Sequence, residues 1–382
     1  MKQIESSSFE FISIDANSLY DFYNALFVAS GFDKSNAEVI ASGIHYADLR
    51  GIDTHGCINL MNIYLPFIEN KQISISQFPQ IISQHGACTT IDGQNTFGYI
   101  VGHYAMQKAI ESAKIYGIGC AVVRNSTHAG CFGFYTKQAV DAKMIGVALT
   151  NLGEQGLLAP PGGVIPLLGT NVIATAAPTV KMPYFNLDMS AAVVSAGRIK
   201  QYAKMGKNVP LGWLIDNAGQ FTTDPNEYLK GMARLTFLGS DQGTGGYKGF
   251  GLALLADILC GVLSNGKVGP HAGNLDQNKQ DKKKINQNIS HFFIAINPDA
   301  FISIDLFCER LDDLLTTITK STPQKTQQPV SYPGFNEYKI MSERIKNGIP
   351  LTIELFTNIQ NIAHRYNISS PIDMKNQQIE IV

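Results

Sequence analysis

One histidine stands in a loop directly after a strand-like segment. His128 lies within the sequence Asn-Ser-Thr-His-Ala-Gly of residues 125–130. Residues 117–124 before it are apolar and β-branched, as in a buried strand, and residues 132–144 are typical of a helix. Loops at strand ends carry the chemistry of many α/β enzymes. Because an imidazole titrates at a pH of about 6.5, His128 is suited to exchange a proton with an alcohol or a carbonyl. The same six residues are also compatible with a histidine that only bonds loop backbone groups.

A second group of polar residues follows a predicted helix. Residues 47–56 read Ala-Asp-Leu-Arg-Gly-Ile-Asp-Thr-His-Gly, so that Thr54 and His55 stand where the chain turns. Both side chains could face a ligand. An alternative for Asp48 and Arg50 is a local ion pair that organises the turn.

Imidazoles and carboxylates in this region also raise the question of a metal site. His45, Asp48, Asp53 and His55 lie within eleven residues of one another. Neither a HExxH motif nor two histidines on one helix face is present, so no metal is expected.

A third feature is glycine-rich sequence. Residues 243–251 contain five glycines and lead into a predicted helix that carries Lys248 near its start. Backbone amides at a helix start can hold a phosphate, and Lys248 could pair with it. The chain has no strand-turn-helix GxGxxG and no Walker motif. Neither a standard dinucleotide fold nor a nucleotide hydrolase is therefore predicted.

Composition narrows the class of protein. The chain has 382 residues, 45% hydrophobic and 16% charged, with a formal net charge of -1. This length suggests two packed regions, and the charge lacks the basic excess of a nucleic-acid surface. Its six cysteines show no CxxC pair and are read as reduced thiols. The amino-terminal residues carry no signal, and the apolar run 251–263 is too short to span a membrane. A cytoplasmic protein without a membrane partner is expected.

Helices are predicted at both ends of the chain and strands in its middle. Asp15 begins one helix, Gly31 is a plausible C-cap, and Thr352 stands near the start of another. Further expected helices are 36–49, 99–116, 248–263, 342–346 and 351–366, and expected strands are 145–151, 172–177, 184–189 and 291–297. The polar segment 277–287 is predicted to be an exposed loop.

Taken in order, eight segments resemble the malate/L-lactate dehydrogenase family. These NAD(P)-dependent 2-hydroxyacid oxidoreductases lack the usual Rossmann domain and include ureidoglycolate and sulfolactate dehydrogenases. No single segment is decisive, but eight in the same order make chance agreement improbable. The segments are 47–56, 125–135, 160–178, 187–189, 212–219, 222–225, 247–252 and 332–334.

The resemblance implies an α/β fold with a distinctive non-Rossmann cofactor domain built on a mixed sheet, at residues 86–304. It implies a helical substrate and dimerisation domain formed by residues 1–85 and 305–382. The expected partners are a small 2-hydroxyacid or 2-oxoacid, a second copy of the chain in a homodimer, and NAD or NADP, with NAD slightly favoured.

The resemblance also implies roles for individual residues. His128 is the expected general acid/base. The side chains expected at the substrate are Arg50, Thr54, His55 and Asn59. The side chains expected at the cofactor are His55, Asn151, Asp188, Met189, Ser190 and Lys248.

The chain departs from the family pattern near the expected substrate site. Asn59 stands where relatives commonly carry an arginine that clamps a carboxylate with two parallel hydrogen bonds. The tyrosine expected four residues later falls at Ile63, with Tyr64 one place further on. At the cofactor side, Ala191 and Ala192 replace the usual Thr-Ser, and Val172 replaces a proline.

Two other functions fit the same residues. A reductase of cyclic imino acids could use this scaffold, since a C=N bond accepts a hydride as a carbonyl does. A catalytically silent relative that still binds the cofactor would explain Asn59, although the presence of His128 and Lys248 favours an enzyme.

Overall fold

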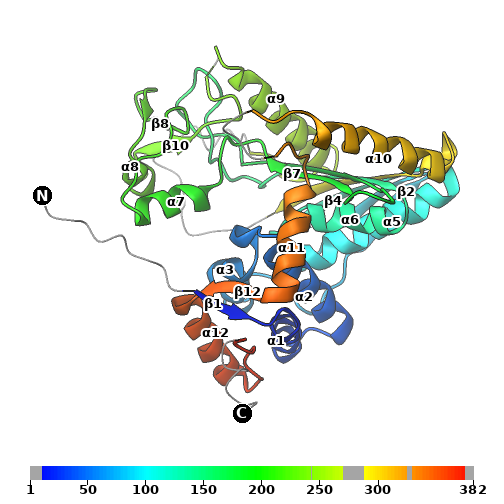
Figure 1. The fold of residues 1–382 in the computed structure, drawn as a ribbon, viewed down its shortest axis with the longest axis horizontal. Coiled ribbons are helices and arrows are strands. Elements are labelled where there is room, and N and C mark those ends of the chain that lie inside the picture. Colours follow the sequence, from blue (N-terminus) through cyan, green and yellow to red (C-terminus); the bar gives the residue numbers. More distant parts are fainter. Residues whose placement is uncertain (1–10, 242, 270–287, 325–328, 375–382) are drawn as a thin grey trace, which may run out of the picture.

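The computed structural model describes residues 11–241, 243–269, 288–324 and 329–374. A large part built on a sheet lies above a smaller helical part in Figure 1. The predicted loop at 277–287 lies outside the described residues.

A seven-stranded mixed sheet forms the centre of the large part. Only β3 and β4 pair in parallel, and the other neighbours are antiparallel. The strands in sheet order are β2 (Gln80–His85), β3 (Cys88–Asp92), β4 (Ile118–Ser126), β11 (Ile289–Ile296), β5 (Ile145–Thr150), β6 (Val172–Ala177) and β7 (Phe185–Ser190). The strands predicted near 145–151, 172–177, 184–189 and 291–297 are thus confirmed.

Helices cover both faces of this sheet. α5 (Gly98–Tyr116) and α6 (Gly133–Asp141) pack on one face, and α9 (Gly246–Asp257) continues into the π-helix η3 (Ile258–Val262) on the other. Because side chains alternate along a strand, Val123 joins the core under α5 whereas Val122 faces η3. This two-sided burial explains the continuous apolar sequence of β4.

The helical part combines both ends of the chain. Asp15 caps α1 (Ala16–Ala29), and Asp33 caps α2 (Lys34–Leu49). From the other end come α11 (Phe335–Asn347) and α12 (Ile353–Tyr366), which is capped by Thr352. The strands β1 (Phe11–Ile14) and β12 (Ile349–Thr352) pair and join the two ends. The fold class predicted from the sequence, a mixed α/β protein with helical segments, is confirmed.

A small three-stranded sheet was not expected. It contains β8 (Leu214–Asp216), β9 (Phe221–Thr222) and β10 (Ala233–Leu235), and it packs with α7 (Ala196–Lys204) and α8 (Pro225–Leu229) around a separate apolar core. In Figure 1 this unit lies at the end of the large part that is remote from β2.

A further helix, α10 (Ile304–Lys320), is hydrogen-bonded to the loop between β6 and β7. The Asp312 carboxylate accepts hydrogen bonds from the backbone N–H groups of Val180, Lys181 and Met182. The predicted boundary near residue 305 would place this helix with the helical domain, and the division into domains stays a prediction.

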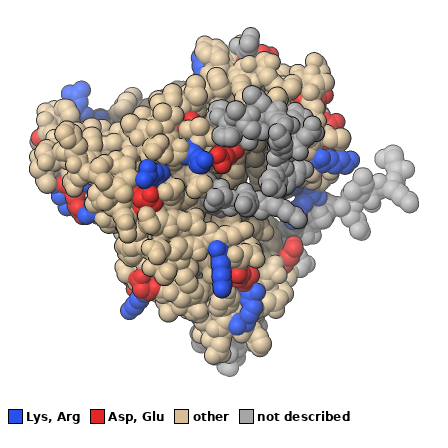
Figure 2. Space-filling model, turned by 180° about the vertical axis from the view of Figure 1, so that it is seen from behind, with Lys and Arg blue, Asp and Glu red and all other residues tan. Residues whose placement is uncertain are grey.

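On the face drawn in Figure 2, basic and acidic side chains lie interspersed among uncharged residues. Among the described residues, no helix is both long and apolar enough to cross a membrane.

Candidate active site

The His128 loop lies between β4 and α6. Asn125, the last residue but one of β4, has a left-handed conformation with φ of 53°. The Thr127 hydroxyl accepts a 2.8 Å hydrogen bond from the Gly98 backbone N–H at the start of α5. Gly130 has φ of 68°, and a Cβ there would overlap the Tyr99 hydroxyl oxygen. The loop therefore needs glycine both for its backbone conformation and for this close approach.

Tyr64 contacts the imidazole of His128. Its hydroxyl lies 3.1 Å from His128 Nδ1 and 3.2 Å from the hydroxyl of Tyr99. The chain reaches Tyr64 through α3 (Cys57–Asn59) and the π-helix η2 (Leu60–Tyr64), and α4 (Leu65–Glu69) follows directly. In the sequence, Tyr64 stands one place beyond the position where the family resemblance expects a tyrosine, yet its side chain lies in the candidate site.

His55 stacks beside His128. Their ring centroids are 5.9 Å apart with an interplanar angle of 20°. The hydroxyl of Thr54 lies 3.0 Å from His55 Nδ1, and both residues belong to the short helix η1 (Asp53–His55). Gly197, in the first turn of α7, approaches Thr54 closely enough that a Cβ there would lie 2.9 Å from its methyl group. Thr54, His55 and His128 are thus brought together.

Asn59 also reaches this group. Its side chain is buried, and its carboxamide is one of the groups that lower the pKa of the Tyr64 phenol. Burial raises the pKa of Tyr64, and the neighbouring Tyr99 hydroxyl and Asn59 carboxamide act in the opposite direction. The residue that replaces the expected arginine is therefore a neutral neighbour of the Tyr64 phenol.

Burial keeps both imidazoles neutral. It lowers the pKa of His128 to about 3, helped by the nearby His55 and His291, and it lowers the pKa of His55 to about 4. At neutral pH the cluster of His128, His55, Tyr64 and Asn59 therefore carries no formal charge. An anionic substrate placed here would favour the imidazolium form and raise these pKa values.

A buried carboxyl group supports the segment that carries Thr54 and His55. Asp48 accepts hydrogen bonds from the Tyr23 hydroxyl at 2.7 Å and from the Cys57 backbone N–H at 2.9 Å. Burial raises the pKa of Asp48 to about 7, and these two bonds oppose that rise. A Cβ on Gly56 would overlap the Asp48 carboxylate. Within the described ranges, Asp48 and Arg50 form no ion pair.

Arg50 occupies a different position from the imidazoles. It is only 2% exposed, its guanidinium lies 5.2 Å from the ring centroids of both Tyr46 and Tyr184, and it donates to the Gly334 carbonyl at 3.4 Å. Its long-range electrostatic partners include Asp188. Two aromatic rings and a backbone carbonyl therefore hold Arg50 in the interior.

Asp188 anchors the far end of the His128 loop. Its carboxylate accepts a 2.7 Å hydrogen bond from the backbone N–H of Gly133, the first residue of α6. Burial raises the pKa of Asp188 to about 6, while the N–H groups of Gly133 and Phe132 and the charge of Arg50 lower it. Met189 and Ser190 follow at the end of β7.

Lys248 lies in the first turn of α9 and is exposed. Its neighbour Gly249 packs on Leu238. The backbone N–H of Leu238 donates a hydrogen bond to the carbonyl of Ala191, just beyond β7. Lys248 therefore lies on the same side of the molecule as the end of β7. An exposed ammonium at the positive end of a helix has the chemistry that a phosphate requires.

Asn151 is a structural crosslink in this structure. It is fully buried, its amide nitrogen donates to Asp257 at 2.9 Å and to the Lys267 carbonyl at 2.7 Å, and its amide oxygen accepts from the backbones of Gly153 and Ser290. These four bonds use every hydrogen-bonding position of the carboxamide.

His291 lies behind the loop and was missed by sequence reasoning. Its two ring nitrogens lie 2.8 Å from the Ser126 hydroxyl and 2.9 Å from the Thr150 hydroxyl, and it is fully buried. Ser126 and His291 are 165 positions apart. The sequence offers no local signal for such a pairing.

His291 gives a prediction for stability at acid pH. Burial lowers its pKa to about 3, whereas in an unfolded chain the value is about 6.5. Between these values the unfolded chain binds a proton that the folded chain does not, so the free energy of unfolding falls by roughly 1.4 kcal/mol per pH unit as pH decreases. In a His291→Gln variant, the free energy of unfolding measured with urea should depend less steeply on pH in this range, by the equivalent of about one bound proton. An unchanged slope would contradict the assignment, and His85→Gln on the exposed strand β2 is the control.

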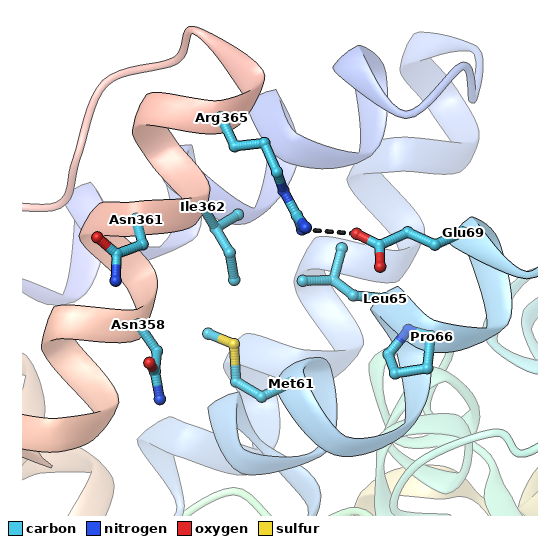
Figure 3. Close-up of a pocket in the computed structure, with 8 residues that line it drawn as sticks. All are labelled: Met61, Leu65, Pro66, Glu69, Asn358, Asn361, Ile362 and Arg365. Carbon is cyan, nitrogen blue, oxygen red and sulfur yellow. Dashed lines mark ion pairs between the residues drawn. The ribbon is translucent and has the colours of Figure 1, made fainter.

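The other side of the π-helix η2 borders a surface pocket of about 340 Å3 (Figure 3). Met61 and Leu65 point toward Ile362 of α12, and an ion pair of 2.6 Å joins Arg365 to Glu69 at its rim. The pocket lies between η2, α4 and α12, so Tyr64 and Met61 project from the same turn to different surroundings.

Among the described residues, no three metal-binding side chains gather at one point.

Comparison with known proteins gives a consistent result. Residues 14–360 match the model of a family described as malate/L-lactate dehydrogenase. A malate dehydrogenase of Pyrococcus abyssi is 34% identical over 358 residues, which cover 94% of this chain and 96% of the relative. An L-sulfolactate dehydrogenase of Methanocaldococcus jannaschii is 31% identical over 339 residues, covering 89% and 93% of the two chains. The crystal structure of a malate dehydrogenase from Entamoeba histolytica superposes with a TM-score of 0.88 at 30% identity, covering 95% of this chain and 100% of that one.

Proposed function

Because the chain belongs to the malate/L-lactate dehydrogenase family, we propose that it transfers a hydride between NAD or NADP and a small 2-hydroxyacid or 2-oxoacid. His128 is the general acid/base in this proposal. The observation that carries it is the position of His128, at the end of β4, between Tyr64 and His55. A homodimer in the cytoplasm, as the family resemblance implies, completes the proposal.

The residues present fit a nicotinamide dinucleotide. Lys248 offers an ammonium group at the start of α9, and Asp188 to Ser190 form the end of β7 on the same side of the molecule. Lys248 would hold a phosphate, and the end of β7 would line the cofactor. When bound, the nicotinamide accepts or supplies the hydride.

The protein supplies position and a proton. Neutral His128 accepts the hydroxyl proton during oxidation and returns it to the carbonyl oxygen during reduction. The substrate carboxylate favours the imidazolium, because an opposite charge nearby offsets the burial that lowers the pKa of His128. His55, held by Thr54, forms the second wall against which the substrate aligns.

The test is oxidation of NADH and of NADPH, followed by absorbance, with purified protein. Suitable substrates are pyruvate, oxaloacetate, glyoxylate derivatives, sulfopyruvate and cyclic imines. Turnover on an oxo acid supports the proposal, and the preferred nucleotide identifies the cofactor. Turnover on imines alone would replace it with an imine reductase. Cofactor binding without any turnover would indicate a silent relative.

Asn59 gives a prediction about substrate affinity. An Asn59→Arg variant should lower the KM for a simple 2-oxo acid by about 10-fold, because a charge-assisted hydrogen bond to a carboxylate is worth roughly 1.5–3 kcal/mol. Steady-state kinetics with both NADH and NADPH measures this effect. Asn59→Gln is the control for side-chain length, and equal KM values in the two variants would place carboxylate binding at another residue.

A further inference from the structure

Two cysteines stand side by side in the central sheet. The strands β3 and β4 pair in parallel, and their register sets Cys88 directly opposite Cys120. Neighbouring strands of a sheet lie about 4.8 Å apart. The backbone N–H of Cys120 donates a 2.9 Å hydrogen bond to the carbonyl of Ala87, which fixes the register next to the pair. The fold therefore makes neighbours of two residues that are remote in the sequence.

Both thiols lie on the face of the sheet that α9 and η3 cover. Gly119 faces α5 instead, because a Cβ there would overlap the carbonyl of Ala109. Side chains alternate along a strand, so Cys120 points to the other face, where it packs at the border of the apolar cluster that contains Phe292. Cys88 shares this face by register, and its charge is one of the influences on the Cys120 thiol.

The two thiols differ in their access to solvent. Cys88 is exposed, whereas Cys120 is half-buried. Burial, followed by the neighbouring Cys88, raises the pKa of Cys120 to about 12. Cys120 therefore keeps its proton at neutral pH, and an oxidant dissolved in water meets Cys88 first.

We propose that Cys88 and Cys120 are a modification site at which a peroxide forms a reversible disulfide, with Cys88 attacked first and Cys120 closing the bond. The sulfur of Cys88 attacks the O–O bond of hydrogen peroxide, which gives a sulfenic acid and one water molecule. The sulfur of Cys120 then attacks that of Cys88, and the hydroxyl group leaves with the Cys120 proton as a second water molecule. The two thiols lose two electrons, which the peroxide gains, and a dithiol reductant reverses the change.

The backbone at the pair is compatible with such a bond. A disulfide joins residues whose Cα atoms lie roughly 4.4–6.8 Å apart, and the spacing of neighbouring strands falls in this range. The Cβ atoms must approach more closely than in an ordinary strand pair, so one strand must shift slightly. Cys88 begins β3 directly after a turn at Gly86, where nothing lies within 4 Å of an added Cβ. The hairpin partner β2 is exposed along its length, so this edge of the sheet can take up the shift.

The bond would be selective and would strengthen the sheet. The other cysteines are buried, which keeps a dissolved oxidant from them: Cys57, Cys131, Cys260 and Cys308. A link between Cys88 and Cys120 encloses the whole of α5, whose first residue, Gly98, is bonded to the His128 loop through Thr127. Such a closed loop restricts the unfolded chain and stabilises the folded one.

The test starts from the reduced full-length protein, treated with hydrogen peroxide at neutral pH and then denatured for titration with a thiol reagent. The number of titratable thiols should fall from six to four, because one disulfide consumes two of them. Peptide mapping without reductant should find the peptides of Cys88 and Cys120 joined within one chain. Dithiothreitol should restore all the thiols, and the urea midpoint of the oxidised protein should exceed that of the reduced protein.

Single variants test the order of the two steps. Cys120→Ser should stop at the sulfenic acid of Cys88, which dimedone traps, and Cys88→Ser should keep all its remaining thiols. Cys308→Ser is the control, because a serine hydroxyl can keep the bond that the Cys308 thiol donates to the Pro178 carbonyl at 3.5 Å. This variant should still lose two thiols. An unchanged thiol count in the treated wild-type protein, a link between two chains, or a link through another cysteine overturns the proposal.

Discussion

Replacing His128 with alanine should lower turnover by roughly 10²–10⁴-fold, the usual contribution of one general acid/base group. The proton of the substrate hydroxyl would then lose the acceptor positioned for it. The Tyr64 phenol cannot take that role, because burial raises its pKa and it keeps its own proton at neutral pH. The remaining imidazole, His55, is fixed by Thr54 in its own position beside His128.

The His128→Ala variant should retain its fold and its ability to bind the cofactor. The residues expected at the cofactor lie at the end of β7 and the start of α9, whereas the loop backbone is held by Thr127, Asp188 and Tyr135 through bonds that do not involve the imidazole. Fluorescence titration with NADH measures retention of cofactor binding, and kcat is measured on the best substrate of the panel. His364→Ala, on α12, controls for the loss of an imidazole. Near-normal turnover in His128→Ala would remove His128 from the acid/base role.

The sequence predicted those features of the site that depend on local pattern. The apolar run before His128 indicated β4, and the polar turn after α2 indicated where Thr54 and His55 stand. Strand-like composition located β5 and β6, and Asp15 and Thr352 marked helix starts by their capping chemistry. Each of these signals is contained within a few neighbouring residues.

The features that escaped prediction depend on distant residues. The contact between the Tyr64 hydroxyl and the His128 imidazole joins residues 64 positions apart. A single turn of π-helix has no sequence signature that distinguishes it from a turn of α-helix. The small sheet was missed because β9 has two residues and β8 three, too few to show an alternating pattern. The segment that begins at His291 was predicted as a strand from its composition. The side-chain partners of His291, which are Ser126 and Thr150, come from two other strands.

Asn151 and Lys248 were expected together at the cofactor, and their surroundings predict opposite behaviour for their alanine variants. Asn151→Ala should lower the free energy of unfolding by about 3–5 kcal/mol, because it leaves buried donors and acceptors unpaired. The groups affected are the carboxylate of Asp257, whose other partners are Asn171 and Gly269, and the backbones of Gly153, Lys267 and Ser290.

Lys248→Ala should instead weaken cofactor binding and leave stability nearly unchanged, because the ammonium is exposed and forms no ion pair among the described residues. Urea unfolding and NADH titration of both variants measure the two effects independently, with exposed Asn358→Ala as the stability control (Figure 3). A stable Asn151→Ala protein with weakened NADH binding would make Asn151 a cofactor contact after all. The two variants are expected to separate because four saturated internal bonds fix Asn151 within the fold, whereas Lys248 presents its charge to solvent, where a phosphate can reach it.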